Sequence, residues 1–545
     1  MLGDYRKAIV AMALPMFVSL MVAQLNTFVD TFWCSSLGET ALAAVGIVAS
    51  FYLIIVGIGS GVGIGISSTI AAKIARKNKE GVDRVATVSL KFMLAVGLIC
   101  VPVFLLIGDP ILQLVGGDDT YAEGSDYGFP FYICAWILVM QGVCAGILRG
   151  EGASRKSMYI LVIAALLNIV FDPLFTFVFD WGIAGLSWAT VMATAISLIP
   201  FIYWYFVKPE SVYADVKLRK YPVKRDDLDD FLAVGIPKTV ELDVMYSVNF
   251  LLNYFVVYCW GSYGFAVYVT AYKYVDLILV PSVALAGALV PVASAAFSAR
   301  NYEKLRAAYA YSMKAAAAIT LVLAVIFFAA MDWAVILFTY DDSTIGMRGD
   351  MIHVARILLV VAVLFAGINI SSALLQSIGM ARASLFSTII RNMLIIVAFW
   401  FGGMVLVSPD AIWWGFDLCE VFGVALMAAW AEYGIRLRTG GEGPGEPSSP
   451  YLGMNFAGRC PADVPDVGFQ SVPHIPRRMA GRLSISPPCV IRKNAAQHDP
   501  ADILFIHSFI NGGYLRNSGE LYVRDYRRNM VRIPADRIPR REIAQ

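Results

Sequence analysis

Two amide–carboxylate pairs lie inside long apolar runs of the sequence. Asn26 precedes Asp30 by four residues, and Asn168 precedes Asp172 by four, so each pair would share one face of a helix. A carboxylate at the centre of a bilayer costs about 2.5–3.5 kcal/mol on insertion scales. Both acids are therefore candidates for function; the alternative is a structural role, in which neighbouring helices satisfy them.

A hydroxyl at Thr190 is expected at a similar depth and would complete an oxygen-only cluster with these two pairs. Oxygen ligands suit a hard cation such as Na⁺, or a proton, and not zinc or copper. Two acids that share a buried site also favour proton binding by one of them. A carrier driven by Na⁺ or H⁺ needs this chemistry, and the sequence leaves the choice of ion open.

Two further residues, Pro15 and Glu241, accompany these pairs as candidates. Pro15 lies about four turns before Asp30 and can kink that helix; a plain packing kink is the alternative. Glu241 lies beside Lys238, where a cavity-facing role and a salt bridge are both open. Asn26 and Glu241 are the candidates for contacts with a substrate in a central cavity.

The composition points to a membrane protein. The chain has 545 residues, of which 58% are hydrophobic and 15% charged, with mean hydropathy +0.67. Soluble domains carry roughly a quarter charged residues. A formal net charge of +2 argues against a nucleic-acid partner. The eight cysteines form no CxxC pair, which argues against a disulfide framework or zinc site.

Twelve apolar runs before residue 437 are long enough to span a membrane, which takes about 20 residues per helix. Spanning backbone must satisfy its own hydrogen bonds, so these runs are predicted to be helices. The first run contains Asp30 and lacks a cleavage site, so it is not interpreted as a signal peptide. The expected spans are 8–33, 41–72, 85–107, 128–148, 157–179, 183–207, 230–258, 264–297, 308–338, 352–378, 384–407 and 412–435.

Charges in the connecting loops predict the orientation. One set of alternate loops is rich in Lys and Arg, for instance residues 73–84 and 208–225. The other set is mainly acidic, for instance residues 109–126. Both ends of the membrane unit are therefore expected in the cytoplasm, in a multi-pass protein of the cell membrane.

The two halves of the apolar region resemble each other at a nearly constant difference in residue number. Six spans per copy insert both copies the same way round. Two such bundles around a central cavity are typical of a transporter whose halves rock. The matched landmarks are Leu14-Pro15 with Ile236-Pro237, the segments 75–78 and 298–301, and Gly152-Ala153-Ser154-Arg155 with Gly379-Met380-Ala381-Arg382.

A glycine-rich run, residues 57–65, does not indicate a nucleotide site. It follows no strand, lies within an apolar span and is interpreted as a surface for close helix packing. No ATP site is visible, so transport would depend on an ion gradient or a partner. Arg391, inside a later span, is expected to be structural.

Several motifs resemble the multidrug and toxic compound extrusion (MATE) family, over about residues 1–437. The resemblance implies two V-shaped lobes of six helices each, and export of organic, often cationic, compounds in exchange for Na⁺ or H⁺. The motifs are Asn168-Ile-Val-Phe-Asp172-Pro173, the run 182–190 ending at Thr190, Ala13-Leu14-Pro15, Val29-Asp30-Thr31 and the run 146–152.

Matched by motif, the archaeal and DinF-like branch of this family implies a cation site at specific positions. It would consist of Asp30, Asn168, Asp172 and Thr190, with a backbone carbonyl near Leu186, and Pro15 would be the kinking proline. The second lobe departs from the NorM-like branch, because the tenth span, around Asn369, has no carboxylate. This departure argues against a coupling site in the second lobe.

The expected organisation is a first lobe at 1–207, a cytoplasmic linker at 208–229, a second lobe at 230–438 and a tail at 439–545. The tail opens with a Gly- and Pro-rich linker and has no apolar periodicity. A disordered extension and an aberrant, frame-shifted C-terminus are both considered. A lipid-binding or regulatory arm is a further alternative.

The functional expectation is a secondary antiporter that exports small organic, cationic or amphipathic molecules. It would act as a monomer in lipid, without a cofactor other than the coupling ion. A flippase for lipid-linked or polar metabolites is the alternative within transporters. An intramembrane enzyme would need a polar catalytic set such as HExxH, which the chain lacks. A non-transporting scaffold would not need a duplicated bundle with matched carboxylates.

Overall fold

The computed structural model describes residues 3–35, 37, 39–339, 345–439, 514–517, 520–524 and 530–533. The chain divides into a helical unit, residues 1–447, and a second unit, residues 448–545. The described part of the second unit is a three-stranded antiparallel sheet of order β1-β2-β3, with Leu515 opposite Tyr522 and Leu521 opposite Ile533. Its strands are β1 (Tyr514–Asn517), β2 (Glu520–Arg524) and β3 (Met530–Ile533). The expectation of a disordered or aberrant tail concerns a segment that lies mostly outside the described residues.

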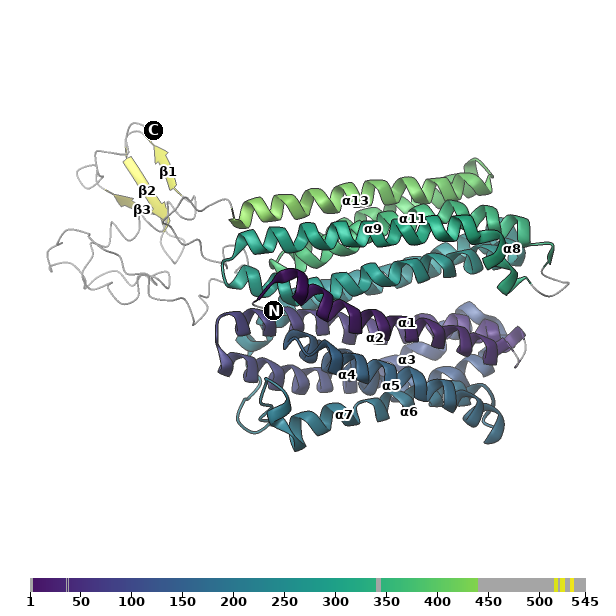
Figure 1. Ribbon diagram of the computed structural model, residues 1–545, viewed down its shortest axis with the longest axis horizontal. Coiled ribbons are helices and arrows are strands. Elements are labelled where there is room, and N and C mark those ends of the chain that lie inside the picture. Colours follow the sequence, from purple (N-terminus) through teal and green to yellow (C-terminus); the bar gives the residue numbers. More distant parts are fainter. Residues whose placement is uncertain are drawn as a thin grey trace. The chain divides into compact units, whose positions relative to one another are not determined.

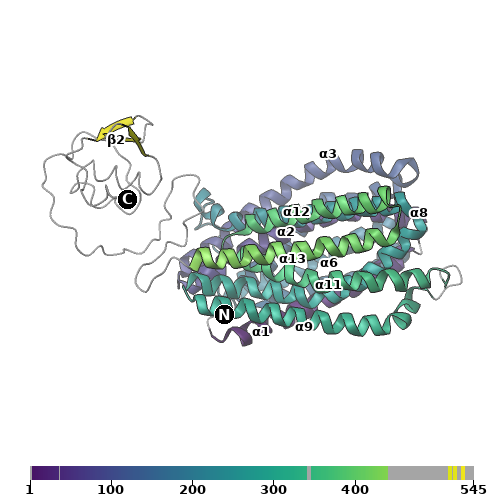
Figure 2. The ribbon, with the colours of Figure 1, turned by 90° about the horizontal axis from the view of Figure 1, so that it is seen from above.

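The helical unit consists of two groups of long helices, which Figures 1 and 2 show running side by side. The first group contains α1 (Tyr5–Ser35), α2 (Glu39–Ala75), α3 (Lys79–Ile133), α4 (Ala135–Gly150), α5 (Ser154–Pro173), α6 (Gly182–Ser197) and α7 (Ile199–Ile202), with the short helices η1 (Leu174–Val178), η2 (Tyr203–Val207) and η3 (Pro209–Ser211). The second contains α8 (Arg225–Ser298), α9 (Tyr302–Ala334), α11 (Arg348–Ser377), α12 (Ala381–Trp400) and α13 (Pro409–Thr439), with η4 (Val335–Phe338) and η5 (Phe401–Val405).

Eleven of the described helical segments are long and apolar enough to cross a membrane by themselves. The segments Tyr121–Ile133 and Ala135–Gly150 form a pair bent by 52°, and counting this pair as one span gives twelve. α8 supplies two spans, because the chain reverses at Gly261 with φ 65°. The ends of the spans lie within a few residues of those predicted, apart from the third and fourth spans, where α3 is longer.

The duplicated landmarks adopt matching backbone conformations. Lys77 and Arg300, equivalent positions in the two copies, both have positive φ, 57° and 55°. The next residue caps the following helix in each copy: Asn78 Oδ1 accepts from Gly81 N at 2.8 Å, and Asn301 Oδ1 accepts from Lys304 N at 3.0 Å. The repeat read from the sequence is therefore a repeat of backbone geometry.

In the later half of each copy, equivalent positions are separated by the same number of residues as Gly152 and Gly379. These two glycines have φ 83° and 75° and end the preceding helices. The π-helical turns η1 and η5 begin at positions 174 and 401, and the helices that follow begin at positions 182 and 409. Asp180, between η1 and α6, has φ 59°, and Val407, between η5 and α13, has φ 48°. This register pairs positions in α5 and α6 with positions in α12 and α13.

The glycine-rich run of α2 is a packing surface, as predicted. A Cβ added at Gly61 would lie 2.4 Å from Thr239 Oγ1 of α8, in the other lobe. One added at Gly59 would lie 2.4 Å from Val139 O of α4. Alternate glycines thus let α2 approach two neighbouring helices closely.

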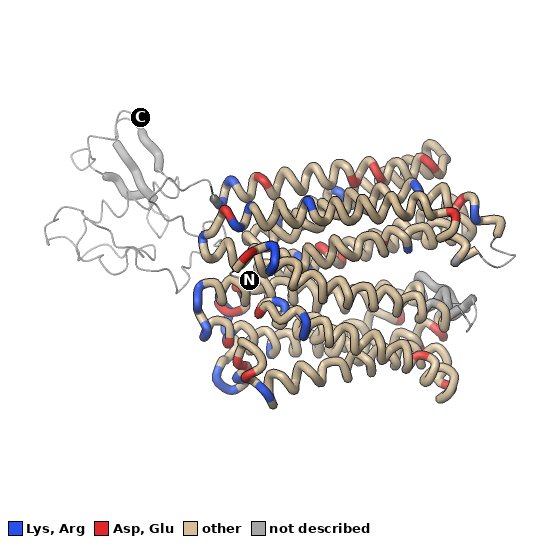
Figure 3. Tube along the Cα trace, in the orientation of Figure 1, with Lys and Arg blue, Asp and Glu red and all other residues tan. Residues whose placement is uncertain are grey.

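The lobes meet near the end of the bundle where the chain begins. There Ser68 of α2 and Ser294 of α8 share a 2.8 Å hydrogen bond, and Met12 and Met16 of α1 pack into one apolar cluster with residues of α8 and α11. Lys and Arg gather at this end, which we call the basic end (Figure 3).

The inter-lobe linker, residues 208–224, is fastened to the first lobe at the basic end. Glu151 accepts hydrogen bonds from Tyr205 Oη at 2.7 Å and from the backbone N–H groups of Tyr213 and Ala214 at 2.9 Å each. Burial raises the pKa of the Glu151 carboxyl, against the effect of these three bonds. Lys91 of α3 donates to Tyr221 O at 2.8 Å and holds the other end of the linker.

Candidate ion and substrate sites

The structure joins the two predicted amide–carboxylate pairs into one chain of hydrogen bonds between α1 and α5. Asn26 Nδ2 donates to Asp30 Oδ2 at 3.0 Å and lies 2.8 Å from Asn168 Oδ1. Asn168 Nδ2 in turn donates to Asp172 Oδ1 at 2.6 Å. The helical period places each amide beside its own acid, and the packing of α1 on α5 brings the two pairs together.

This cluster is buried and has unused acceptor oxygens. Asp172 is 1% exposed and Asn168 4%. Among the described residues, Asp30 Oδ1, Asp172 Oδ2 and Asn26 Oδ1 are buried without a hydrogen-bond partner, and the two carboxyls interact directly with one another. Adjacent carboxylates in a medium of low polarity need a proton or a cation to offset their charge.

Thr190, Leu186 and Pro15 lie on the helices expected for them. The Thr190 hydroxyl donates to Leu186 O at 3.1 Å, which links the two positions on α6 that the resemblance assigned to the ion site. Pro15 is buried within α1, which is one helix from Tyr5 to Ser35. The structure records no contact between Thr190 and the two acids, so its role as an ion ligand stays a prediction.

Two tyrosines near the acids were not found by sequence reasoning. Tyr52 of α2 and Tyr127 of α3 lie within electrostatic reach of Asp30, and Tyr127 also of Asp172. They carry no spacing signal toward α1 or α5. Only the tertiary packing brings these phenols close to the carboxyls.

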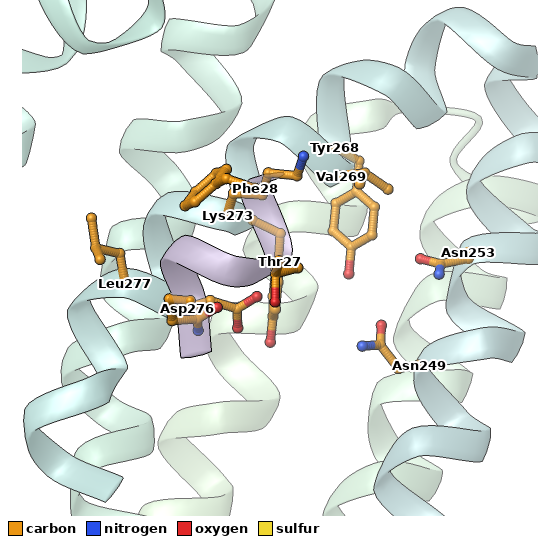
Figure 4. A pocket seen from close by; sticks show the side chains of 11 residues that line it. Thr27, Phe28, Asn249, Asn253, Tyr268, Val269, Lys273, Asp276 and Leu277 are labelled. Carbon is orange, nitrogen blue, oxygen red and sulfur yellow. The ribbon is translucent and has the colours of Figure 1, made fainter. Parts of the chain in front are cut away.

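A cavity of about 210 Å³ lies between α1 and both spans of α8 (Figure 4). Its α1 wall belongs to the first lobe and its α8 walls to the second. One lysine, Lys273, and one aspartate, Asp276, line it, and Lys273 Nζ lies 5.6 Å from the centre of the Phe28 ring. The lining residues are Gln24, Thr27, Phe28, Asn249, Asn253, Tyr268, Val269, Tyr272, Lys273, Asp276 and Leu277.

Asn26 and Glu241, the candidates for substrate contact, are not among these lining residues. Asn26 faces Asn168, as described above. Glu241 is 6% exposed and receives Lys238 Nζ at 2.8 Å, Ser372 Oγ at 3.0 Å and Ser384 Oγ at 2.8 Å. Of the two roles left open for Glu241, the structure shows the salt bridge; a contact with substrate stays a prediction.

Arg391 makes a buried ion pair, in line with the structural role expected of it. Its Nη1 lies 3.2 Å from both carboxylate oxygens of Glu420, and Nη2 donates to Asn392 Oδ1 at 3.0 Å. The guanidinium lies 4.9 Å from the centre of the Phe365 ring. Arg391 and Glu420 are 3% and 1% exposed, so the pair ties α12 to α13 inside the second lobe.

Comparison with known proteins agrees with this architecture. The MatE family model matches residues 15–174 and again residues 237–401, one match in each lobe. The multidrug export protein MepA of Staphylococcus aureus (strain N315) is 23% identical over 414 residues, which are 75% of this chain and 89% of that protein.

Solved structures give the same result at higher identity. A MOP superfamily transporter from Pyrococcus furiosus, described as having a binding pocket of reverse polarity, superposes with TM-score 0.76 at 32% identity, covering 80% of this chain and 97% of that one. The outward-facing conformation of a multidrug resistance MATE family transporter gives the same values.

Fold and matches together define a polytopic membrane transporter of two six-helix lobes, and not an enzyme. The chain belongs to the MatE family of multidrug efflux transporters. The two-lobe, all-α fold of the helical unit and the family resemblance predicted from the sequence are confirmed.

Proposed function

We propose that this protein exports small organic, cationic or amphipathic molecules in exchange for Na⁺ or H⁺, and that the ion binds in the first lobe. The observation that carries the proposal is the hydrogen-bonded chain Asp30–Asn26–Asn168–Asp172, with an unpartnered oxygen on each acid. Thr190 and the Leu186 carbonyl are added from the family resemblance. A proton or Na⁺ at this site would bring α1 and α5 together, and its release would loosen them.

The central cavity is the proposed substrate site. Its aromatic rings suit an organic cation or an amphipathic molecule, since the face of an aromatic ring attracts positive charge. Asp276 can contact a cationic group, and Lys273 balances its charge in the cavity wall. The cavity lies in the half of the bundle away from the basic end. With the basic end in the cytoplasm, as the loop charges predict, it faces the outside of the cell membrane.

Transport in liposomes tests the proposal. The full-length protein is reconstituted and loaded with a fluorescent organic cation, and a Na⁺ gradient and a pH gradient are imposed separately. Wild type should move the cation with one of the two gradients, which identifies the ion. Asp30→Asn and Asp172→Asn should each lose gradient-driven transport while they remain folded by gel filtration. Wild-type rates in either variant would contradict the proposed ion site.

A further inference from the structure

A buried carboxylate in the second lobe has no partner in the described part of the chain. Asp417 of α13 is 4% exposed, and neither Oδ1 nor Oδ2 makes a hydrogen bond there. An isolated buried carboxylate is among the most costly groups in a protein interior. Something other than a described side chain must therefore offset its charge.

The nearest charged groups already balance each other. Glu420 lies one turn further along α13 on the same face, and both of its oxygens face Arg391 of α12 at 3.2 Å. From α11, Phe365 presents its ring to Arg391. Because Arg391 neutralises Glu420, the charge of Asp417 is left over.

This acid is also close to the central cavity by way of α8. Tyr272 lines the cavity and interacts electrostatically with Glu420, Arg391 and Asp276. Phe416, which precedes Asp417, stacks on Tyr272 with ring centres 6.5 Å apart. The residue that precedes Asp417 on α13 therefore packs directly against a residue of the cavity wall.

The internal repeat relates Asp417 to a position in the first lobe. In the register that relates η1 to η5, position 190 corresponds to position 417. Thr190 is the α6 member of the ion site proposed for the first lobe, and its equivalent in the second lobe is Asp417. The tenth span lacks a carboxylate, but the twelfth carries one.

We propose that Asp417 binds a proton and is the second protonatable site of the transporter, at the repeat equivalent of Thr190. A proton fits better than a metal ion, since both Glu420 oxygens face Arg391 and leave no free carboxylate beside Asp417 to share a cation. That this proton takes part in the transport cycle rests on the antiport function proposed above; proton binding itself does not.

Infrared difference spectroscopy of the full-length protein in detergent tests proton binding without transport. The C=O stretch of a protonated carboxyl separates from ionised carboxylates and amides. Wild type at neutral pH should show such a band, and alkaline pH should remove it. Asp417→Asn should lack this component. Asp410→Asn, an exposed acid on the same helix, is the matched control and should keep it.

A second variant keeps the proposal testable if Asp417→Asn does not fold. Asp417→Thr copies the residue at position 190 and should also lack the band. The proposal is overturned if a folded Asp417 variant keeps the wild-type band over the whole pH range. If the Asp417 variants lose the band but wild type shows no gradient-driven transport, proton binding at Asp417 is supported and the proposed antiport is contradicted. The two ideas can therefore fail separately.

Discussion

The two lobes have the same backbone arrangement but differ in the side chains that they bury at equivalent positions. Their helix ends, left-handed residues and π-helical turns match at a nearly constant difference in residue number. Yet Asn26, Asp30, Asn168 and Asp172 of the first lobe correspond to apolar residues of the second. These counterparts, Val248, Leu252, Ile395 and Phe399, all lie in the buried apolar core of the second lobe.

This difference separates the backbone that the repeat supplies from the side chains on which the proposed ion binding depends. The shared backbone places helices and turns, whereas a few side chains on α1 and α5 make the polar cluster. In the second lobe, Glu241 forms a salt bridge with Lys238, and Glu420 forms one with Arg391. The charges of these two acids are therefore balanced by neighbouring side chains. Asp417 differs from these two acids, because neither of its carboxylate oxygens has a hydrogen-bond partner among the described residues.

The largest expected effect comes from breaking the buried pair of the second lobe. Arg391→Met leaves Glu420 buried and unpaired, which should destabilise the protein by about 3–5 kcal/mol. Thermal unfolding in detergent measures the loss. The double variant Arg391→Met with Glu420→Gln should recover most of it, because no buried charge remains. A double variant as unstable as the single one would show that packing against Phe365, and not charge pairing, sets the cost.

The next effect comes from making the first lobe resemble the second. Asn168→Ile copies Ile395 and removes the amide that donates to Asp172 at 2.6 Å. Hydrogen bonds to charged groups contribute about 1.5–3 kcal/mol, so gradient-driven transport should fall at least about tenfold. Liposome efflux measures this. The reverse change, Ile395→Asn, should instead lower stability by about 1–3 kcal/mol, because it buries an amide in an apolar core. Equal behaviour of the two variants would contradict the asymmetry.

A third prediction concerns the contact between the lobes. Gly61→Ala places a Cβ 2.5 Å from the Thr239 backbone, which cannot move aside as a side-chain tip can. Overpacking of this kind costs about 1–3 kcal/mol and should push the lobes apart at the basic end. Spin-label distances across that end measure the change. Gly46→Ala, on the same helix with nothing within 4 Å, should leave the distances unchanged.

The smallest effect is expected at the linker. Glu151→Gln turns an amide group toward the N–H donors of Tyr213 or Ala214, so at least one hydrogen bond to a charged acceptor is lost. Losing about 1.5 kcal/mol should speed amide hydrogen exchange there about tenfold. Hydrogen exchange at the backbone N–H of Tyr221, whose carbonyl accepts from Lys91 at the other end of the linker, serves as the internal control. Unchanged exchange at Tyr213 and Ala214 would show that other contacts hold the linker.

Much of this architecture could be predicted because its signals are local. Apolar length indicates the spans, short landmarks indicate the repeat, and a spacing of four places Asn168 beside Asp172. The helical period does not say which helix a face meets. The partners of Glu241, which lie on α11 and α12, and the tyrosines near Asp30 follow only from tertiary packing. Asp417 was not predicted, because the family resemblance directs attention to the tenth span for a second-lobe acid, whereas this acid lies on the twelfth.

The central claim is that the first-lobe carboxylates couple an ion to export. The most direct test compares gradient-driven efflux with substrate exchange at equilibrium in the same liposomes, using Asp172→Asn. We expect this variant to lose gradient-driven efflux and still to exchange labelled substrate across the membrane, because the cavity is intact. Gradient-driven efflux at the wild-type rate in Asp172→Asn would contradict it.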